Sequence, residues 1–377
     1  MIDSQTANPT LWLRTRSVLE SGRTQGLHSG AQVAIAFQGR MHSLAIGESV
    51  PGVPMHAGCI GPWLSSGKPL TAVAIARFVE ANKLDWDDPV SRWIPEFGGG
   101  GKDAITLRHL LTHTGGFRDA DRTDPALGWE DCVAAACASP LEPDWIPGET
   151  AGYHANGSWF ILGEILQRVS GRWFTDILQT EVIEPLQLGP GWFGVDPSQR
   201  AQLANDWVVM DRTGRSGRTP DPVLNHPVVI SRCRPGSGLR TTAGFLCRFY
   251  SALLCPPAGW LSEATRRTLL QPQRVGKFDR TFMAPIDLGL GFILPTTQPN
   301  GLTMPYGYGP HASARSFGHS GNQSSCAFAD PDRGLSVAWL TNGMPGEPQH
   351  QRRQQAIHTA IYADLISQSG TDAPPCG

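Results

Sequence analysis

The feature that most constrains this chain is a change of apolar pattern that occurs twice along its 377 residues. Near the start, a helical pattern at residues 11–19 is followed by segment 31–47, which reads as two short strands joined by a turn at Gly39. The middle of the chain carries helical patterns separated by Gly and Pro turns. Strand-like runs return after about Asp287, before a helical tail at 349–365. We therefore expect strands from both ends of the chain to form one sheet.

The expected organisation follows from this order of patterns. We predict an α/β fold in which an antiparallel sheet is flanked by helices and a mostly helical domain is inserted between its strands. Residues 1–58 and 285–377 would form the discontinuous sheet domain, and residues 59–284 the helical domain. The active site would lie in the cleft between the two. A length of 377 residues suits about two domains of ordinary size.

The composition excludes several classes of protein. Charged residues make up 17% of the chain and hydrophobic residues 40%, which is incompatible with intrinsic disorder. The 31 basic side chains are balanced by 33 acidic ones without a dense basic run, so nucleic acid is not an expected partner. The first residues lack a signal-peptide pattern, and no apolar run is long enough to span a bilayer. We therefore expect a cytoplasmic protein without a membrane partner.

Motifs for metals and cofactors are weak. The eight cysteines are scattered without a Cys-x-x-Cys pair, and most are expected to be reduced. His109 and His113 stand four residues apart, but Leu110 occupies the place of the glutamate that a His-Glu-x-x-His zinc site requires. The glycines at 98–101 are not followed by the Lys-Ser/Thr of a phosphate-binding loop. We expect neither a metal nor a cofactor.

The most informative short segment is Ser65-Ser66-Gly67-Lys68, at the start of a helical pattern. A spacing of three places Ser65 and Lys68 on one face of a helix. A serine hydroxyl is a weak nucleophile until a base accepts its proton, and desolvation can lower the pKa of a lysine enough for it to help. The helix N-terminus also favours developing negative charge. A helix-capping serine beside a solvated lysine is the alternative interpretation.

Two further hypotheses concern the surroundings of a nucleophile. Trp63 and Trp159 could form the wall of an apolar acyl pocket, because aromatic side chains often line ligand sites, although most tryptophans belong to the core. Gly236-Ser237-Gly238 is a partial match to the Gly-x-Ser-x-Gly motif of α/β-hydrolases. Its flanking pattern is a turn before a helix, so Ser237 is a weak candidate for the nucleophile.

Six sequence blocks, in order, favour the catalytic interpretation of Ser65. In these blocks the chain resembles, over nearly its whole length, the serine β-lactamase and penicillin-binding-protein superfamily, especially its class C-like esterase branch. The resemblance implies a β-lactamase/transpeptidase-like fold. The blocks are SGAQVAIAFQGR, LSSGKPLTAVAIARFVEANKLDWDDPVSRWIPEF, ITLRHLLTHTGGF, PGETAGYHANGSWFILGEILQRVSG, GSGLRTTAGFLCRFY and FGHSGNQSSCAFADPDRGLSVAWLTN.

The resemblance also implies roles for individual residues. Ser65 would be the acylated nucleophile, and Lys68 would accept its proton or tune it. The oxyanion hole would consist of the backbone N–H groups of Ser65 and Asn322.

A third motif of the family is altered here. His319-Ser320-Gly321 stands where many relatives have Lys-Thr-Gly, and by the resemblance it would bind substrate. A histidine at position 319 should recognise a substrate carboxylate less well than a lysine at neutral pH. This change favours substrates other than β-lactams.

The family's Tyr-x-Asn motif is lengthened by one residue to Tyr153-His154-Ala155-Asn156. Counted from the preceding Pro-Gly turn, Tyr153 takes the tyrosine position; counted back from the following helix, His154 takes it. We favour Tyr153 as the general base, acting as a tyrosinate stabilised by Lys68, and His154 is the reserve candidate. His154 would otherwise contact substrate, and Asn156 would bind a substrate carbonyl or hold Lys68.

The predicted function is that of a serine hydrolase or acyltransferase that acts on a small-molecule ester or amide through an acyl-serine intermediate. A carboxylesterase or a biosynthetic transesterase is the first interpretation, because the expected cytoplasmic location does not suit a cell-wall peptidase. A β-lactamase or a D-aminopeptidase-type amidase is the alternative enzyme. A binding protein that keeps the fold without the chemistry is the alternative of another class.

Overall fold

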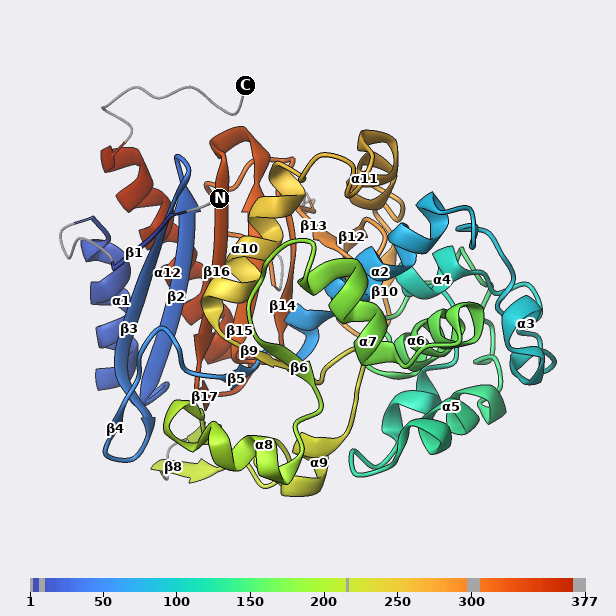
Figure 1. Ribbon diagram of the computed structural model, residues 1–377, viewed down its shortest axis with the longest axis horizontal. Helices are drawn as coiled ribbons and strands as arrows, with labels where there is room; N and C mark the ends of the chain where they lie inside the picture. The colour runs from blue at the N-terminus through green and yellow to red at the C-terminus, as the bar shows by residue number, and fades with distance from the viewer. Residues whose placement is uncertain (1–2, 7–10, 215–216, 297–305, 369–377) are drawn as a thin grey trace.

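The computed structural model describes residues 3–6, 11–214, 217–296 and 306–368 (Figure 1). Nine strands within these ranges form one sheet, and every neighbouring pair is antiparallel except β1 and β3, which are parallel. Strands from both ends of the chain meet in it, as predicted. The order across the sheet is β1 (Asp3–Thr6), β3 (Arg40–Val50), β2 (Gly30–Phe37), β16 (Leu335–Thr341), β15 (Ser325–Asp330), β14 (Phe317–Gly321), β13 (Ile293–Leu294) and β12 (Asp287–Leu288), with β4 (Val53–Pro54) beside β3.

The first hairpin of the sheet forms where the sequence predicts it. β2 and β3 pair from Gly30 opposite Gly47 to Phe37 opposite Arg40. The turn between them is made by Gln38 and Gly39, both in the left-handed region with φ of 51° and 74°. A two-residue turn with two positive φ angles matches the twist of antiparallel strands, which explains the glycine.

The last predicted strands differ more from the structure. The run at 288–294 yields only the short strands β12 and β13. Gly291, between them, has a φ of 80°, and a Cβ atom there would lie 2.5 Å from the Cβ of Ala72. The chain therefore bends at this glycine to approach helix α2 (Lys68–Glu80) closely, instead of continuing as one strand.

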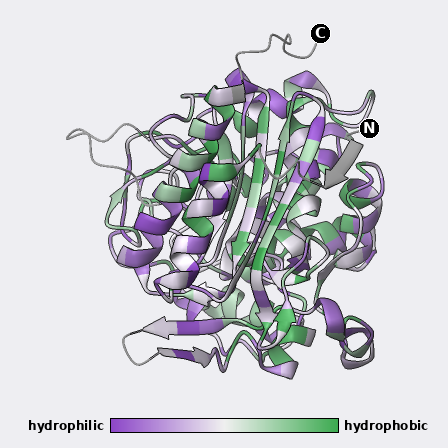
Figure 2. Cartoon of the chain, turned by 90° about the vertical axis from the view of Figure 1, so that its left-hand side faces the viewer, coloured by the Kyte–Doolittle hydropathy of each residue, from purple (hydrophilic) through white to green (hydrophobic). Residues whose placement is uncertain are grey.

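The two faces of the sheet carry different side chains. Large residues of the central strands face the helices α1 (Leu13–Thr24) and α12 (Glu347–Gln368), while small residues face α10 (Ala243–Leu254). Strand alternation separates the two sets, and alanines let α10 approach the sheet closely. Figure 2 shows the hydrophobic colour concentrated in these strands. The large residues are Val33, Ile35, Phe328, Val337 and Trp339; the small ones are Ala34, Ala36, Ala327, Ala329 and Ala338.

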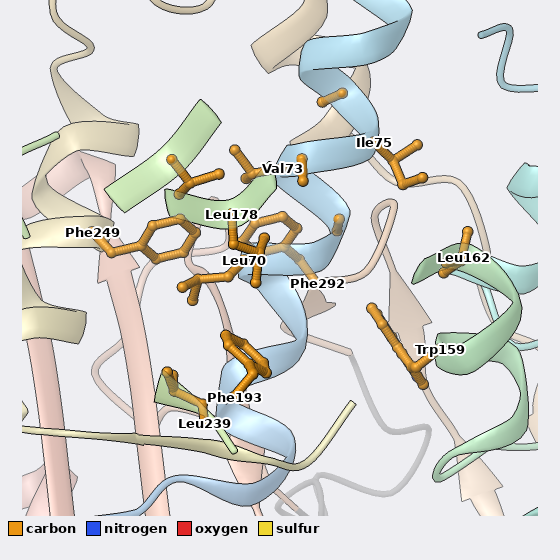
Figure 3. Close-up of a cluster of buried hydrophobic side chains, with 14 of the residues drawn as sticks. Leu70, Val73, Ile75, Trp159, Leu162, Leu178, Phe193, Leu239, Phe249 and Phe292 are labelled. Atoms are coloured by element: carbon orange, nitrogen blue, oxygen red, sulfur yellow. The ribbon is translucent and has the colours of Figure 1, made fainter. Parts of the chain in front are cut away.

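Helix α2 is the centre of the helical part. Ten of its thirteen residues are buried. Figure 3 shows Leu70 on the side that faces Phe249 of α10, and Ile75 on the opposite side, toward Leu162 of α6 (Gly157–Ser170). Each fully buried side chain of this size contributes about 1.5–3 kcal/mol to folding. The core that surrounds α2 continues to the alanine face of the sheet, so the segments predicted as two domains share one core.

The other elements surround this core. The middle of the chain also contains short strands that its helical patterns do not indicate. One of them, β9 (Leu239–Thr241), pairs with β5 (Gly61–Pro62), the strand that comes just before Ser65. The helices are α3 (Val90–Trp93), α4 (Leu107–Leu111), α5 (Trp129–Ala138), α7 (Phe174–Leu178), α8 (Pro197–Gln202), α9 (Pro227–Ser231) and α11 (Glu263–Leu270). The strands are β5 (Gly61–Pro62), β9 (Leu239–Thr241) and β6 (Gly191–Phe193); β17 (Gly343–Met344), β7 (Asp211–Gly214) and β8 (Gly217–Pro220); and β10 (Phe278–Asp279) with β11 (Ala284–Pro285).

Candidate active site

Ser65 lies in a single 3₁₀ turn, Leu64–Gly67, that leads directly into α2. Leu64, just before it, adopts a left-handed conformation with φ of 49°, which is unfavourable for a leucine. Strain of this kind persists only where the surroundings impose it, and it concentrates at functional sites. The turn presents Ser65 at the surface of a pocket while its neighbours Leu64 and Ser66 are buried.

The turn is fastened to the sheet by hydroxyl groups. Ser66 Oγ donates to the carbonyl of His319 at 3.1 Å and lies 3.1 Å from Ser325 Oγ. Ser325 Oγ in turn donates to the carbonyl of Trp63 at 2.9 Å. These bonds join the Leu64–Gly67 turn to β14 and β15, so Ser65 is held against the end of β14.

Lys68 reaches Ser65 as the spacing predicts. Its Nζ lies 2.9 Å from Ser65 Oγ and 2.8 Å from each of two backbone carbonyl oxygens, those of Ala155 and Gly236. The side chain is completely buried. Burial, opposed by the charge of Asp121, lowers the pKa of Lys68 to about 7. A large fraction of this amine is therefore neutral at physiological pH.

The two carbonyl groups also orient the amine. A neutral –NH₂ group has two N–H donors and one lone pair, and the carbonyls of Ala155 and Gly236 accept both N–H bonds. The lone pair of Lys68 is then left for the third partner, the hydroxyl of Ser65. The arrangement is that of a base aimed at the proton of Ser65.

Tyr153 lies on the other side of Ser65. Its phenol hydrogen-bonds with Ser65, and its ring centroid is 5.2 Å from Lys68 Nζ. The ring packs against His113 at 4.4 Å and Phe282 at 4.9 Å between centroids. Burial raises the pKa of Tyr153 far above its usual value, so the phenol keeps its proton at neutral pH. Tyr153 is therefore a neutral phenol at rest and not the tyrosinate expected from the sequence.

His154 lies outside this group. It is completely buried, its Nε2 accepts from the backbone N–H groups of Gly116 and Phe117 at 3.1 and 3.3 Å, and its Nδ1 donates to the carbonyl of Gly152 at 2.7 Å. Both ring nitrogens are thus used within the protein. Of the two registers considered for this motif, the structure places Tyr153 at Ser65.

Asn156 does line the pocket. Its Oδ1 accepts a hydrogen bond from Ser237 Oγ at 3.2 Å, so it contacts a pocket hydroxyl rather than Lys68. Its backbone is held by Asp121, whose carboxylate accepts from the N–H groups of Ala155, Asn156 and Gly157 at 2.6–2.7 Å. Asp121 thereby caps α6 from a distant turn and positions the carbonyl of Ala155 that orients Lys68.

The His-Ser-Gly segment forms the last part of β14. His319 is buried, its Nδ1 donates to the carbonyl of Ser320 at 2.8 Å, and burial together with the charge of Lys68 lowers the pKa of His319 to about 3. Ser320 pairs with Cys326, which belongs to the core beneath α1 and α12, so its side chain faces away from Ser65. Position 319 therefore holds a neutral side chain where many relatives would have a cation.

Gly321 lets β14 approach the Leu64–Gly67 turn closely. A Cβ atom on Gly321 would lie only 2.4 Å from the carbonyl oxygen of Trp63, so a larger residue would push the two segments apart. Asn322 follows directly and lines the same pocket as Ser65. This placement suits the two N–H groups expected to form the oxyanion hole.

The pocket beside Ser65 has a volume of about 750 Å³. Neither Trp63 nor Trp159 lines it, because both rings are completely buried; Trp159 instead lies 5.3 Å from Lys68 Nζ. The proposed tryptophan wall is therefore wrong. The lining contains aliphatic and proline side chains, among them Val223, Leu224, Val229, Met344 and Pro345, together with the arginines Arg212, Arg234 and Arg240.

The weaker sequence signals have structural roles. His109 accepts the N–H of Thr106 in a capping box of α4, and His113 Nδ1 accepts the N–H of His154 at 3.0 Å. Ser237 lines the pocket but Lys68 contacts Ser65, not Ser237. Within the described ranges, no cluster of three or more His, Cys, Asp or Glu side chains is placed to hold a metal ion, and no helix is long and apolar enough to cross a membrane.

Comparisons with known proteins find similar chains along most of the sequence. A protein-family model described as Beta-lactamase matches residues 15–361. The chain is similar to penicillin-binding protein 4 of Amycolatopsis lactamdurans, at 27% identity over 91% of this chain and 85% of the relative. It is 26% identical to esterase EstB of Burkholderia gladioli, over 89% and 91% of the two chains. A crystal structure of a penicillin-binding protein homologue from Caulobacter crescentus matches 94% of this chain and 99% of that chain, with a TM-score of 0.75 and 28% identity.

Proposed function

The chain belongs to the beta-lactamase family, as its sequence blocks predicted, and we propose that it cleaves carboxylic esters through an acyl-Ser65 intermediate. Its β-lactamase/transpeptidase-like fold is confirmed. The similarity to an esterase supports a serine hydrolase on this fold. The acyl group would pass to water or to a second alcohol.

The observation that carries this proposal is the contact between Lys68 and Ser65. A buried amine with a pKa of about 7 is held 2.9 Å from a serine hydroxyl by two carbonyl groups, where it can accept the proton of that hydroxyl. Burying a lysine costs free energy, and a capping or solvated lysine would avoid that cost. The arrangement favours catalysis over the alternative of a binding protein that has lost its chemistry.

In the first step, the neutral amine of Lys68 would accept the proton of Ser65 while Oγ bonds to the ester carbonyl carbon. The carbonyl oxygen becomes negative, and the N–H groups of Ser65 and Asn322 would donate to it. The ester C–O bond then breaks. The departing alkoxide would take the phenol proton of Tyr153, and Lys68 would pass the proton from Ser65 on to Tyr153, so that the alcohol leaves neutral and Lys68 is again a free amine.

In the second step, water would attack the acyl-serine carbonyl. Its proton would pass to the neutral amine of Lys68 and then return to Ser65 as the acid is released. Any alcohol that fits the pocket would react in the same way and would yield a new ester. The proton path is the same in both cases, so the acceptor decides between hydrolysis and transesterification.

The choice of esters over β-lactams rests on His319. The resemblance places this residue where relatives have a lysine, and its buried, neutral imidazole provides no positive charge for a β-lactam carboxylate at pH 7. We expect a 4-nitrophenyl ester to be turned over faster than a chromogenic cephalosporin. Faster turnover of the cephalosporin would favour the β-lactamase alternative instead.

Covalent labelling tests the nucleophile directly. The wild-type protein should gain the mass of one fluorophosphonate adduct, Ser65→Ala should gain none, and Ser237→Ala should be labelled like the wild type. Ser237 is the matched control because its hydroxyl lines the same pocket. A label that persists in Ser65→Ala would overturn the proposal.

A further inference from the structure

The pocket beside Ser65 contains buried positive charge that the proposed steps do not use. Arg234 and Arg240 line it, and these two residues are only 7% and 5% exposed. Neither forms an ion pair with a carboxylate in the described ranges of the chain. Arg212, in the same lining, differs because its Nε donates to Asp221 Oδ2 at 2.7 Å.

The contacts of the two arginines are few and neutral. Arg234 donates to the carbonyl of Pro125 at 3.2 Å, hydrogen-bonds with Cys132 and lies 5.4 Å from the ring centroid of Phe160. Asp121 and Asp124 act on Arg234 only over a longer distance.

Arg240 donates to the carbonyl of Leu224 at 2.9 Å and lies 5.1 Å from the ring centroid of Trp207. Burial lowers the pKa of Arg240 to about 9, and the charge of Arg200 acts in the same direction. A buried charge without a counter-charge costs free energy. A ligand that supplies negative charge would offset this cost.

One turn of the backbone brings the two arginines into the pocket. The N–H of Gly238 donates to the carbonyl of Arg234 at 2.8 Å, and a Cβ atom on Gly238 would lie 2.9 Å from that oxygen. The chain then enters β9, where Arg240 pairs with Pro62, three residues before Ser65. The turn 234–240 also provides the Gly236 carbonyl that orients Lys68. The charged wall of the pocket is thus built directly against the nucleophile.

We propose that Arg234 and Arg240 bind an anionic group of the substrate, a carboxylate or a phosphate, while the ester carbonyl lies at Ser65. Guanidinium groups have planar donors that match both anions. Val223, Leu224 and Val229, in the same pocket, would cover the apolar chain that joins the anion to the ester. Anion recognition would then come from the turn 234–240, since His319 on β14 is neutral. The assignment of the anion to the substrate rests on the proposed function; the anion site itself does not.

The first experiment compares two esters that differ in charge. Mono-4-nitrophenyl glutarate carries a carboxylate that 4-nitrophenyl butyrate lacks, and the ratio of their kcat/KM values reports anion recognition. We expect Arg234→Gln and Arg240→Gln each to lower this ratio by about tenfold to a hundredfold, the range for a lost hydrogen bond to a charged group. An unchanged ratio in both variants would overturn the proposal.

Two controls keep this result interpretable. Both esters are measured on one preparation, so a variant that folds only in part still gives a valid ratio. The double variant Arg212→Gln/Asp221→Asn should leave the ratio unchanged, because it removes an ion pair and no net charge from the pocket. Arg240→Lys should lower the ratio of kcat/KM values less than Arg240→Gln does, because lysine keeps the positive charge.

A binding experiment separates the two anions and does not depend on catalysis. Hexanoate, hexyl phosphate and hexanol are titrated into Ser65→Ala by calorimetry. Tighter binding of either anion than of hexanol supports the proposal and identifies the anionic group; equal binding of all three overturns it. If the anions bind but the wild type cleaves neither ester, the proposed function fails while the anion site stands.

Discussion

Two lysines, Lys68 and Lys102, are buried in this molecule in similar ways, and only Lys68 contacts the hydroxyl of Ser65, the proposed nucleophile. Lys68 and Lys102 each donate to two backbone carbonyls, and burial lowers the pKa of both. The carbonyls that hold Lys102 belong to Ala136 and Cys137, at the end of α5, where a cation stabilises the helix dipole. Lys68 has Ser65 Oγ as its third partner. A buried lysine alone is therefore no sign of catalysis; the third contact makes the difference.

The strongest test of this comparison replaces each lysine in turn. Lys68→Met should slow acylation by a 4-nitrophenyl ester by about 10³-fold or more, because the base of Ser65 is lost. Lys102→Met should keep the acylation rate per folded molecule and lower the free energy of unfolding by about 1–3 kcal/mol. Stopped-flow acylation and denaturant unfolding measure the two effects. Equal loss of acylation in both variants would refute the distinction.

Tyr153 and His154, the two candidates in the lengthened motif, show the same contrast between a residue that contacts Ser65 and one that is bonded within the protein. Tyr153→Phe should slow turnover by about 10²-fold, because the leaving alkoxide loses its proton donor, with little change in stability. His154→Ala should instead lower stability by about 1–3 kcal/mol, because the N–H groups of Gly116 and Phe117 lose their acceptor. Rates are normalised to active sites titrated by the burst of 4-nitrophenol. A larger rate loss in His154→Ala would return the catalytic role to the histidine.

The pH profile should sharpen the assignment of the base. The neutral form of Lys68 is active, so kcat/KM should rise about tenfold per pH unit below about pH 7 and level off above it. Because the pKa of Lys68 is lower in the folded state, the unfolded chain binds the extra proton, and stability should rise between about pH 7 and the ordinary lysine pKa near 10.4. The wild type is compared with Lys68→Met by urea unfolding at several pH values. A profile that is flat from pH 5 to 8 would contradict a lysine base.

The smallest expected effect concerns the residue that supports the orienting carbonyl. Asp121→Asn leaves one acceptor oxygen for the N–H groups of Ala155, Asn156 and Gly157. The substitution should lower kcat by about three- to tenfold. Without the charge of Asp121, the pH profile of kcat/KM should also shift to lower pH, because that charge raises the pKa of Lys68. Asp119→Asn, on an exposed neighbour in the same turn, is the control. A loss of kcat without that pH shift would mean that Asp121 acts only as a cap.

Local patterns account for the part of this structure that the sequence predicted. The hairpin around Gly39, the helix that begins at Lys68 and the Ser65–Lys68 pair each follow from residues close together in the chain. The short strands β7 and β8 escaped prediction, because their largely exposed residues show no apolar alternation.

The rest of the site depends on groups that leave no mark in the sequence. The carbonyls of Ala155 and Gly236 are backbone atoms that any residue would supply, and they lie 87 and 168 positions from Lys68. Asp121 and Arg240 resemble any other charged residues until the fold brings Asp121 to the N–H groups of 155–157 and Arg240 into the lining of the pocket. The register between Tyr153 and His154 was likewise decided by contacts from other segments, such as Gly116.

The pairing of β2 with β16 joins residues about 300 positions apart, such as Ala36 and Ser336. On the ribosome, the first hairpin emerges long before its partner strand has been synthesised. At about 5–20 residues per second, some 15–60 seconds pass during which the inner edge of β2 has no partner strand and the side chains of Val33 and Ile35 lack the cover of α12. The sheet can close only after β16 has left the exit tunnel. Nascent chains of this protein are therefore expected to need chaperone protection until synthesis is nearly complete.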